Sequence, residues 1–475
     1  MLNKILNKTI NKIKEKLQNK SFKQILLVTI LLVGSRIFGF FRQALIGSSY
    51  VDNSTIKYSD VFLNTQKIQD ALIAILIMGT FISTLTPSGA LIIDKEGDVK
   101  FDKYIQWYII TISLVFGLIS LFCYVFIENI LMTIQKGFYI EYQRLGILDL
   151  YVNSARIMCF GFVFFAINTV LQIYLNLKDS FFWNNLSGVV TNIILIIALL
   201  ISDKNFVLPL TIAILISFIV NMFIHLYGAY KVGFRWRFNS INDYVNYYGV
   251  NKDQINNDLK RLVPRIFLIP LSTVAAILVS TKQYDLFPTF YETASTIQGI
   301  FLTVISAVGM VLLPKLSIFN NSDSPQVFIE RINTYIKKFL PLAILGTIGT
   351  FIFARFLLLL VISSGNFKKG IFKFVNTDSN FELQVLMIQV LSFSILFIAI
   401  NEILIKYYLV KNKIKQLLIY NTLSILVFVT VVFIGERFYK FNFALNIAFV
   451  FSLSTALLTA LYYIGIHFDK KKISN

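Results

Sequence analysis

The sequence predicts an all-α polytopic membrane protein with about twelve transmembrane helices arranged as two six-helix lobes. Its 475 residues are 56% hydrophobic and only 15% charged, and the mean hydropathy is +0.70, more apolar than a soluble domain. Apolar windows long enough to cross a bilayer recur along the whole chain. One long polar connection, residues 231–263, separates six windows from six. This layout is typical of alternating-access transporters.

The apolar windows define the expected helices in chain order. Their expected bounds are 23–48, 64–90, 104–128, 155–177, 186–202, 206–230, 264–281, 291–312, 338–363, 384–408, 416–435 and 443–467. An even number of crossings places both termini on one side of the membrane. Lys and Arg are concentrated in the connections on that side, which predicts that both termini are cytoplasmic.

The expected domain organisation follows from these windows. The predicted segments are a basic N-terminal segment at 1–22, an N-lobe at 23–230, a cytoplasmic linker at 231–263, a C-lobe at 264–467 and a basic tail at 468–475. Segment 1–22 alternates Lys with Leu and Ile, so either an amphipathic interfacial helix or a disordered basic tail fits it. The net charge of +19 is a membrane-surface charge that favours anionic lipids and not nucleic acid.

Two arginines, Arg36 and Arg42, lie inside the first apolar window. A cation at membrane depth costs about 2.5–3.5 kcal/mol, so it must pair, face water or bind a charged ligand. In the second window a polar stripe enters from one end, although a solvated helix end would show the same pattern. A further arginine opens the seventh window. The predicted substrate-binding residues are Arg36, Arg42, Asp60, Asn64, Lys67 and Arg265.

Polar residues also share faces in later windows. Asn168, Gln172 and Asn176 form a stripe that suits either a cavity wall or hydrogen bonds between helices. Glu292 and Ser295 share a face that suits either a cavity wall or close packing. Glu402 and Lys406, four residues apart, are expected to form a structural ion pair. A cationic cavity between two lobes is suited to an anionic, phosphate-bearing substrate. No metal site is predicted.

Several short motifs occur in a specific order. They are Ser35-Arg36-Ile37-Phe38-Gly39-Phe40-Phe41-Arg42, Asp60-Val61-Phe62-Leu63, Gly79 with Phe81 and Pro87, Arg156-Ile157-Met158, Leu175-Asn176, Gly233-Phe234-Arg235, Gly309-Met310-Val311-Leu312-Leu313-Pro314-Lys315-Leu316-Ser317 and Gly365-Asn366-Phe367. Together, from about residue 30 to 415, they resemble the MviN/MurJ family of lipid II flippases in the MOP superfamily.

The resemblance implies a V-shaped transporter of the bacterial inner membrane, not an enzyme. It would flip an undecaprenyl-pyrophosphate-linked peptidoglycan precursor outward, with the membrane potential and ions such as Na⁺ or Cl⁻ implicated. No cofactor is expected other than such a coupling ion, and the sequence indicates no site for it. Arg36, Arg42 and Asp60 match functional positions of the family. Cell-wall synthesis enzymes are implied partners.

The chain also departs from the family pattern. The paired arginines of the second span fall on Ile73 and Ala74, a nearby acidic residue falls on Met78, and the arginine of the eighth falls on Ser295. The family usually has fourteen spans. These differences keep two alternatives open: an exporter of another lipid-linked oligosaccharide, of capsule or O-antigen type, and a transport-inactive cell-wall scaffold. A membrane glycosyltransferase is disfavoured, because the longest external connections lack paired carboxylates.

Overall fold

A computed structural model describes most of the chain. The described residues are 20–48, 58–73, 79–202, 207–265, 271–275, 291, 293–299, 301–302, 312, 316, 324–365, 379–439 and 443–474. Every regular element among them is a helix. The helices are α2 (Lys20–Ser48), α3 (Tyr58–Ile73), α4 (Gly79–Glu96), α5 (Asp98–Ile134), α6 (Lys136–Arg144), α7 (Leu148–Cys159), α8 (Gly161–Leu177), α9 (Phe181–Ile201), α10 (Val207–Lys231), α11 (Ile241–Val250), α12 (Lys252–Arg265), α15 (Pro325–Gly365), α16 (Ser379–Val410), α17 (Ile414–Tyr439) and α18 (Phe443–Ser474).

Eight helical stretches within the described residues are long and apolar enough to cross a membrane. They are Asp98–Ile134, Leu148–Leu177, Phe181–Ile201, Val207–Lys231, Pro325–Leu359, Phe381–Val410, Ile414–Gly435 and Leu445–Lys470. They correspond to the third to sixth and ninth to twelfth predicted windows, and α2 corresponds to the first. The prediction of an all-α polytopic membrane fold is therefore confirmed.

Some expected bounds differ from the structure. Of the second window, predicted as one stretch over 64–90, the structure describes α3 and α4, and residues 74–78 lie outside the described part. The external connection expected at 129–154 is largely helical, since it contains α6 and the start of α7. Most of the seventh and eighth windows, and residues 1–19, also lie outside the described part.

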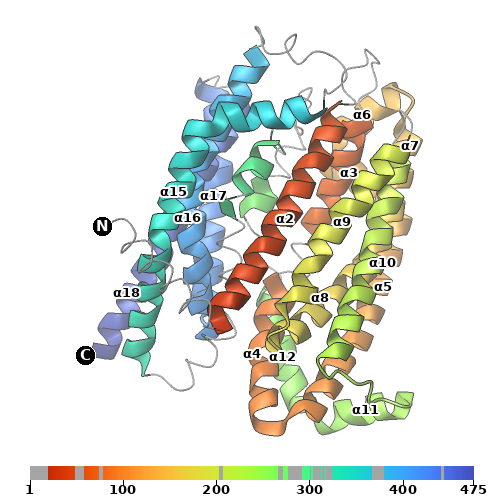
Figure 1. The fold of residues 1–475 in the computed structure, drawn as a ribbon, viewed down its shortest axis with the longest axis vertical. Helices are drawn as coiled ribbons and strands as arrows, with labels where there is room; N and C mark the ends of the chain where they lie inside the picture. Colours follow the sequence, from red (N-terminus) through yellow and green to blue (C-terminus); the bar gives the residue numbers. More distant parts are fainter. Residues whose placement is uncertain are drawn as a thin grey trace, which may run out of the picture.

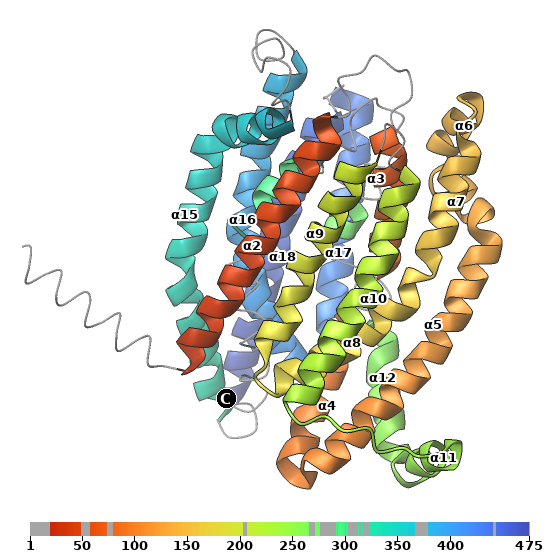
Figure 2. The same cartoon turned by 45° about the vertical axis from the view of Figure 1, so that its right-hand side comes forward.

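The helices form two bundles (Figures 1 and 2). In the N-terminal bundle α9 packs on α2 and α10, and α8 packs on α5 and α10; in the C-terminal bundle α16 packs on α15 and α18, and α17 packs on α18. Helix α2 also packs along α15, so it lies between the bundles, as both views show. The separate buried apolar clusters of the two halves confirm that each bundle has its own core.

Small and polar residues bring α2 close to α9. A methyl group placed on Gly188 would lie 2.8 Å from the Ser35 hydroxyl, and the Asn192 amide donates to the Ser35 carbonyl at 2.9 Å. Close backbone approach with interhelical hydrogen bonds is the usual way helices associate in a bilayer. One face of α2 is thereby fixed to the N-terminal bundle.

The connection predicted as a linker at 231–263 is folded against the N-terminal bundle. It contains a short non-helical segment and the helices α11 and α12, which lie together at one end of the molecule (Figure 2). Its side chains Phe234, Phe238 and Ile255 are buried in the core of that bundle. At the other end of the chain α18 continues to Ser474, so residues 468–474 of the expected basic tail 468–475 continue a helix.

Candidate substrate site between the bundles

Arg36 of α2 reaches the C-terminal bundle. A methyl group placed on Gly299 would lie 3.0 Å from Nη1 and 3.1 Å from Cζ of Arg36, so the guanidinium lies directly over this glycine. Contacts at 3.0–3.4 Å are tighter than ordinary van der Waals packing, so a larger residue at 299 would displace the arginine. Arg36 is exposed. It is thus an accessible cation at the junction between the two bundles.

The glycine under Arg36 belongs to a fixed part of the C-terminal bundle. The neighbouring Gln298 is buried, and its amide donates to the Leu391 carbonyl of α16 at 3.3 Å and to the Ser394 hydroxyl. Ala294 and Ile297 are buried in the core of the same bundle. The contact between Arg36 and Gly299 therefore depends on how the bundles lie relative to each other.

Arg42 has different surroundings from Arg36. Six residues along a helix correspond to a rotation of about 120° between the two side chains. Arg42 is half-buried, and Ile46, one turn further, lies in the core of the N-terminal bundle. The two arginines, predicted together as cavity cations, thus point in different directions. A substrate contact for Arg42 stays a prediction.

The polar stripe of α3 is enclosed by protein. Asn64 is fully buried; its amide donates to the Tyr142 hydroxyl at 3.0 Å, and its backbone carbonyl accepts from Gln135 at 3.4 Å. Lys67, one turn on, is 8% exposed. A solvated helix end is therefore the wrong explanation for these two residues. The side chain of Asp60 lies outside the described part, as do the side chain of Arg265 and all of Glu292.

The polar residues on one face of α8 form hydrogen bonds to the neighbouring helices α9 and α10. Asn168 donates to the Phe218 carbonyl at 2.9 Å, and its amide oxygen lies 2.9 Å from Nδ1 of His225, both on α10. The Asn176 amide oxygen accepts from Asn184 of α9 at 2.8 Å. In this conformation the asparagines act as interhelical hydrogen-bond partners. Gln172 and Ser295 are half-buried, and their predicted contacts with substrate are untested.

The predicted ion pair on α16 is confirmed, because Nζ of Lys406 lies 2.8 Å from Oε1 of Glu402. Elsewhere Arg355 pairs with Glu382 at 2.8 Å, with both side chains 60% exposed. No group of three or more His, Cys, Asp or Glu within the described ranges could hold a metal ion.

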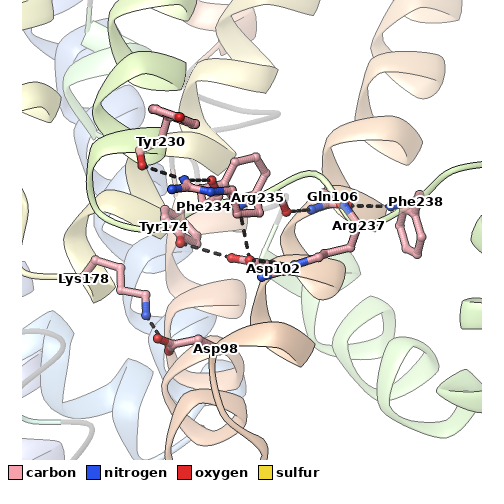
Figure 3. Close-up of polar contacts among 10 residues, drawn as sticks. All are labelled: Asp98, Asp102, Gln106, Tyr174, Lys178, Tyr230, Phe234, Arg235, Arg237 and Phe238. Carbon is pink, nitrogen blue, oxygen red and sulfur yellow. Dashed lines mark hydrogen bonds and ion pairs between the residues drawn. The ribbon is translucent and has the colours of Figure 1, made fainter.

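A buried polar cluster at the start of α5 was not predicted (Figure 3). Asp102 is 1% exposed and accepts from the Tyr174 hydroxyl at 3.1 Å, from the Arg235 amide at 3.2 Å and from Nε of Arg237 at 3.3 Å. One turn on, Gln106 binds the same segment through both its amide nitrogen and oxygen, at 2.6 Å and 2.7 Å. This cluster fixes the beginning of the linker to the N-terminal bundle.

A second carboxylate fixes the end of the linker. Asp258 of α12 is 2% exposed and accepts hydrogen bonds from Ser88 at 2.6 Å, Tyr104 at 2.9 Å and Tyr108 at 3.3 Å. Burial raises the pKa of this carboxyl, and the three hydroxyl donors and the charge of Arg261 offset the rise only in part. Since α12 also contacts α17, the helix connects the N-terminal bundle with the C-terminal one.

A comparison with protein families identifies the chain. The family model described as "Lipid II flippase MurJ" matches residues 53–473. The chain belongs to this family. The match begins after the segment 35–42, which carries part of the resemblance, and continues beyond residue 415, where the motifs end. Members of the family are lipid flippases and not enzymes. The comparison with curated protein sequences gives no significant match.

Solved structures share the fold. A structure of lipid II flippase MurJ in an inward closed conformation has a TM-score of 0.64 at 18% identity, covering 93% of this chain and 87% of that chain. A MOP superfamily transporter from Pyrococcus furiosus, for which a binding pocket of reverse polarity suggests a different function, has a TM-score of 0.70 at 14% identity and 97% coverage of both chains. A mutant of the Vibrio cholerae MATE transporter VcmN has a TM-score of 0.68 at 13% identity, covering 96% of this chain and 98% of that chain.

Proposed function

We propose that this chain moves lipid II, the undecaprenyl-pyrophosphate-linked precursor of peptidoglycan, from the inner to the outer leaflet of the bacterial cell membrane. The observation that carries the proposal is the family match over residues 53–473. The two bundles would move relative to each other to give alternating access, with both chain termini in the cytoplasm. Asp60, Lys67, Arg42 and Arg265 remain further candidates for contact with the substrate.

Arg36 is the residue we assign to the pyrophosphate. A guanidinium presents paired donors that match phosphate oxygens, and such charge-assisted hydrogen bonds are stronger than neutral ones. Arg36 is exposed and lies over Gly299 where the bundles meet. Separation of the bundles at this point would exchange the glycine contact for a phosphate. The membrane potential, Na⁺ or Cl⁻ is the expected energy source, and no described residue is assigned to an ion.

Complementation of a bacterial strain depleted of its own lipid II flippase tests the proposal. Wild type is expected to restore growth, and Arg36→Ala is expected to fail. Loss of a charged hydrogen-bond donor should slow flipping about tenfold to hundredfold. The rate is measured as lipid II that becomes accessible outside the cell. Arg355→Ala is the matched control, since it removes an arginine from an exposed ion pair.

A second variant tests the geometry and not the charge. Gly299→Val keeps Arg36 but places a side chain in the space that its guanidinium occupies, so the rate of flipping should also fall. Membrane insertion and melting temperature are measured for every variant. If folded wild type fails to restore growth, lipid II is the wrong cargo and another lipid-linked glycan becomes the substrate to test. If Arg36→Ala flips at the wild-type rate, the assigned role of Arg36 is wrong.

A further inference from the structure

The two bundles contain the same local structure, in which the turn that ends one helix packs on the start of another helix; we call it a corner. In the N-terminal bundle the turn after α8 has Asp179 at φ 55°, and in the C-terminal bundle the turn after α16 has Asn412 at φ 54°. The backbone hydrogen bonds agree as well: the amide of Lys178 binds the Tyr174 carbonyl at 3.0 Å, and the amide of Lys411 binds the Tyr407 carbonyl at 2.9 Å. Lys411 is therefore the counterpart of Lys178.

The same aromatic pair lies beneath each lysine. Phe101, the fourth residue of α5, packs on Tyr174 and lies 6.0 Å from Nζ of Lys178. Phe328, the fourth residue of α15, packs on Tyr407 and lies 4.8 Å from Nζ of Lys411. A cation over an aromatic face gains electrostatic energy, but this gain does not neutralise its charge.

The corners differ in the anion that faces the lysine. Lys178 forms an ion pair at 2.5 Å with Asp98, the first residue of α5. The first residue of α15 is Pro325, which carries no charge. Within the described part of the chain Lys411 forms no ion pair, and the nearby Lys413 is itself bound to Asp469. Burial and the charge of Lys413 lower the pKa of Lys411, and the more distant Asp469 carboxylate offsets this lowering only in part.

We propose that the corner formed by Pro325, Phe328 and Lys411 binds the phosphate of an anionic phospholipid headgroup, in the position that the Asp98 carboxylate occupies in the other bundle. That position is open to a ligand, because Pro325 is exposed, as is the Asp98 side chain at 68%. The turn 411–413 connects two membrane-spanning helices, so it lies at headgroup level. In the predicted orientation this is the inner leaflet.

The surroundings favour a lipid over free phosphate. Val327 is 44% exposed beside the corner, and the exposed Thr334 and Lys338 follow it on the same face of α15. An anionic headgroup at the membrane surface can meet Lys411 beside this basic face, while its acyl chains lie in the bilayer next to the exposed apolar residues of α15 from Leu342 onward. The exposed Lys415 adds positive charge near the turn. The site concerns lipid binding and does not depend on which cargo the protein carries.

Binding of phosphatidylglycerol to the purified full chain, titrated by native mass spectrometry, tests the proposal. Lys411→Gln should weaken binding about fivefold, since one basic residue at a membrane surface contributes that much. Pro325→Asp should weaken it equally without removing the lysine, because it supplies the carboxylate found in the other bundle. Lys415→Gln makes the same charge change on an exposed residue outside the corner and should have a smaller effect.

Two further binding measurements identify the chemical class of the ligand. Phosphatidylcholine, whose headgroup has no net charge, should show no difference between wild type and Lys411→Gln, and inorganic phosphate at millimolar concentration should not displace bound phosphatidylglycerol. Melting temperatures identify a misfolded variant, and Lys411→Gln suffices if Pro325→Asp misfolds. Equal phosphatidylglycerol binding by wild type and a folded Lys411→Gln overturns the proposal, and so does displacement by inorganic phosphate.

Discussion

The N-terminal and C-terminal bundles build the same corner but complete it with different charges. In both, a tyrosine beneath the lysine donates its hydroxyl to a carboxylate: Tyr174 to Asp102 at 3.1 Å, and Tyr407 to Asp469 at 2.9 Å. Asp102 lies on α5, next to the aromatic residue of its corner, whereas Asp469 lies on the last helix, α18. The position of α15 that corresponds to Asp102 is Ile329.

The helix on which each carboxylate lies determines which segment of the chain it binds. Asp102 also binds Arg235 and Arg237, so the N-terminal corner holds the linker in place (Figure 3). Asp469 binds Lys413 in the adjacent turn and so closes the corner within its own bundle. A repeated local structure has thus been adapted to two tasks: one bundle is joined to the linker, while in the other two lysines, Lys411 and Lys413, share the single carboxylate of Asp469.

The largest expected effect comes from removing the two carboxylates. Asp102→Leu leaves the Arg237 charge and several buried donors without an acceptor, and should lower the free energy of unfolding by about 3–5 kcal/mol. Asp469→Leu removes a pair with a partly exposed lysine, and should cost about 1–2 kcal/mol. Thermal unfolding in one detergent measures both. Equal losses would contradict the different roles assigned to the two corners.

The next effect concerns the other end of the linker. Asp258→Leu leaves three buried hydroxyl groups without their acceptor, so local unfolding of α12 should become about 2 kcal/mol easier. Hydrogen exchange of α12 amides should then be about thirtyfold faster, with α8 amides as the internal control. Unchanged exchange would show that α12 is held by its apolar contacts alone.

The raised pKa of Asp258 gives this contact a pH dependence. A carboxyl whose pKa is higher in the folded state binds more protons there than when the helix is detached. Stability of the docked helix is therefore greatest below the ordinary aspartate pKa and falls as pH rises through the raised value. Exchange of α12 should quicken with pH in that range beyond its intrinsic rate, and Asp258→Asn should remove this extra dependence.

The sequence predicted the helices well, because each depends on local hydropathy. It also predicted the pair of Glu402 and Lys406, since four residues on a helix fix the distance between side chains. Contacts between distant segments were missed. Asp102 meets Arg237 across 135 residues and Ser88 meets Asp258 across 170, and no local pattern specifies those pairings.

The candidate site was predicted in part for the same reason. The two arginines of α2 were found from their cost in a membrane, but nothing in the sequence shows that Arg36 lies over Gly299. Asn168 was recognised as polar, yet only its contacts with α10 show that it joins helices. Which face of a helix meets another bundle depends on tertiary packing, and a helical wheel does not contain that information.

The smallest expected effect on folding stability comes from removing the ion pair that distinguishes the two corners. Lys178 is 15% exposed and Asp98 is 68% exposed, so Asp98→Pro, which copies the C-terminal corner, should cost only about 0.5 kcal/mol in folding free energy. Proline is tolerated at the first position of a helix, which keeps the backbone cost low. The same change should create an anion site, so phosphatidylglycerol binding should rise by about one equivalent, as measured by native mass spectrometry. Asp98→Pro, Lys178→Gln is the control, because it removes the lysine as well and should return binding to the wild-type level. A rise that persists in the double variant would show that the lysine over its aromatic pair does not distinguish the corners.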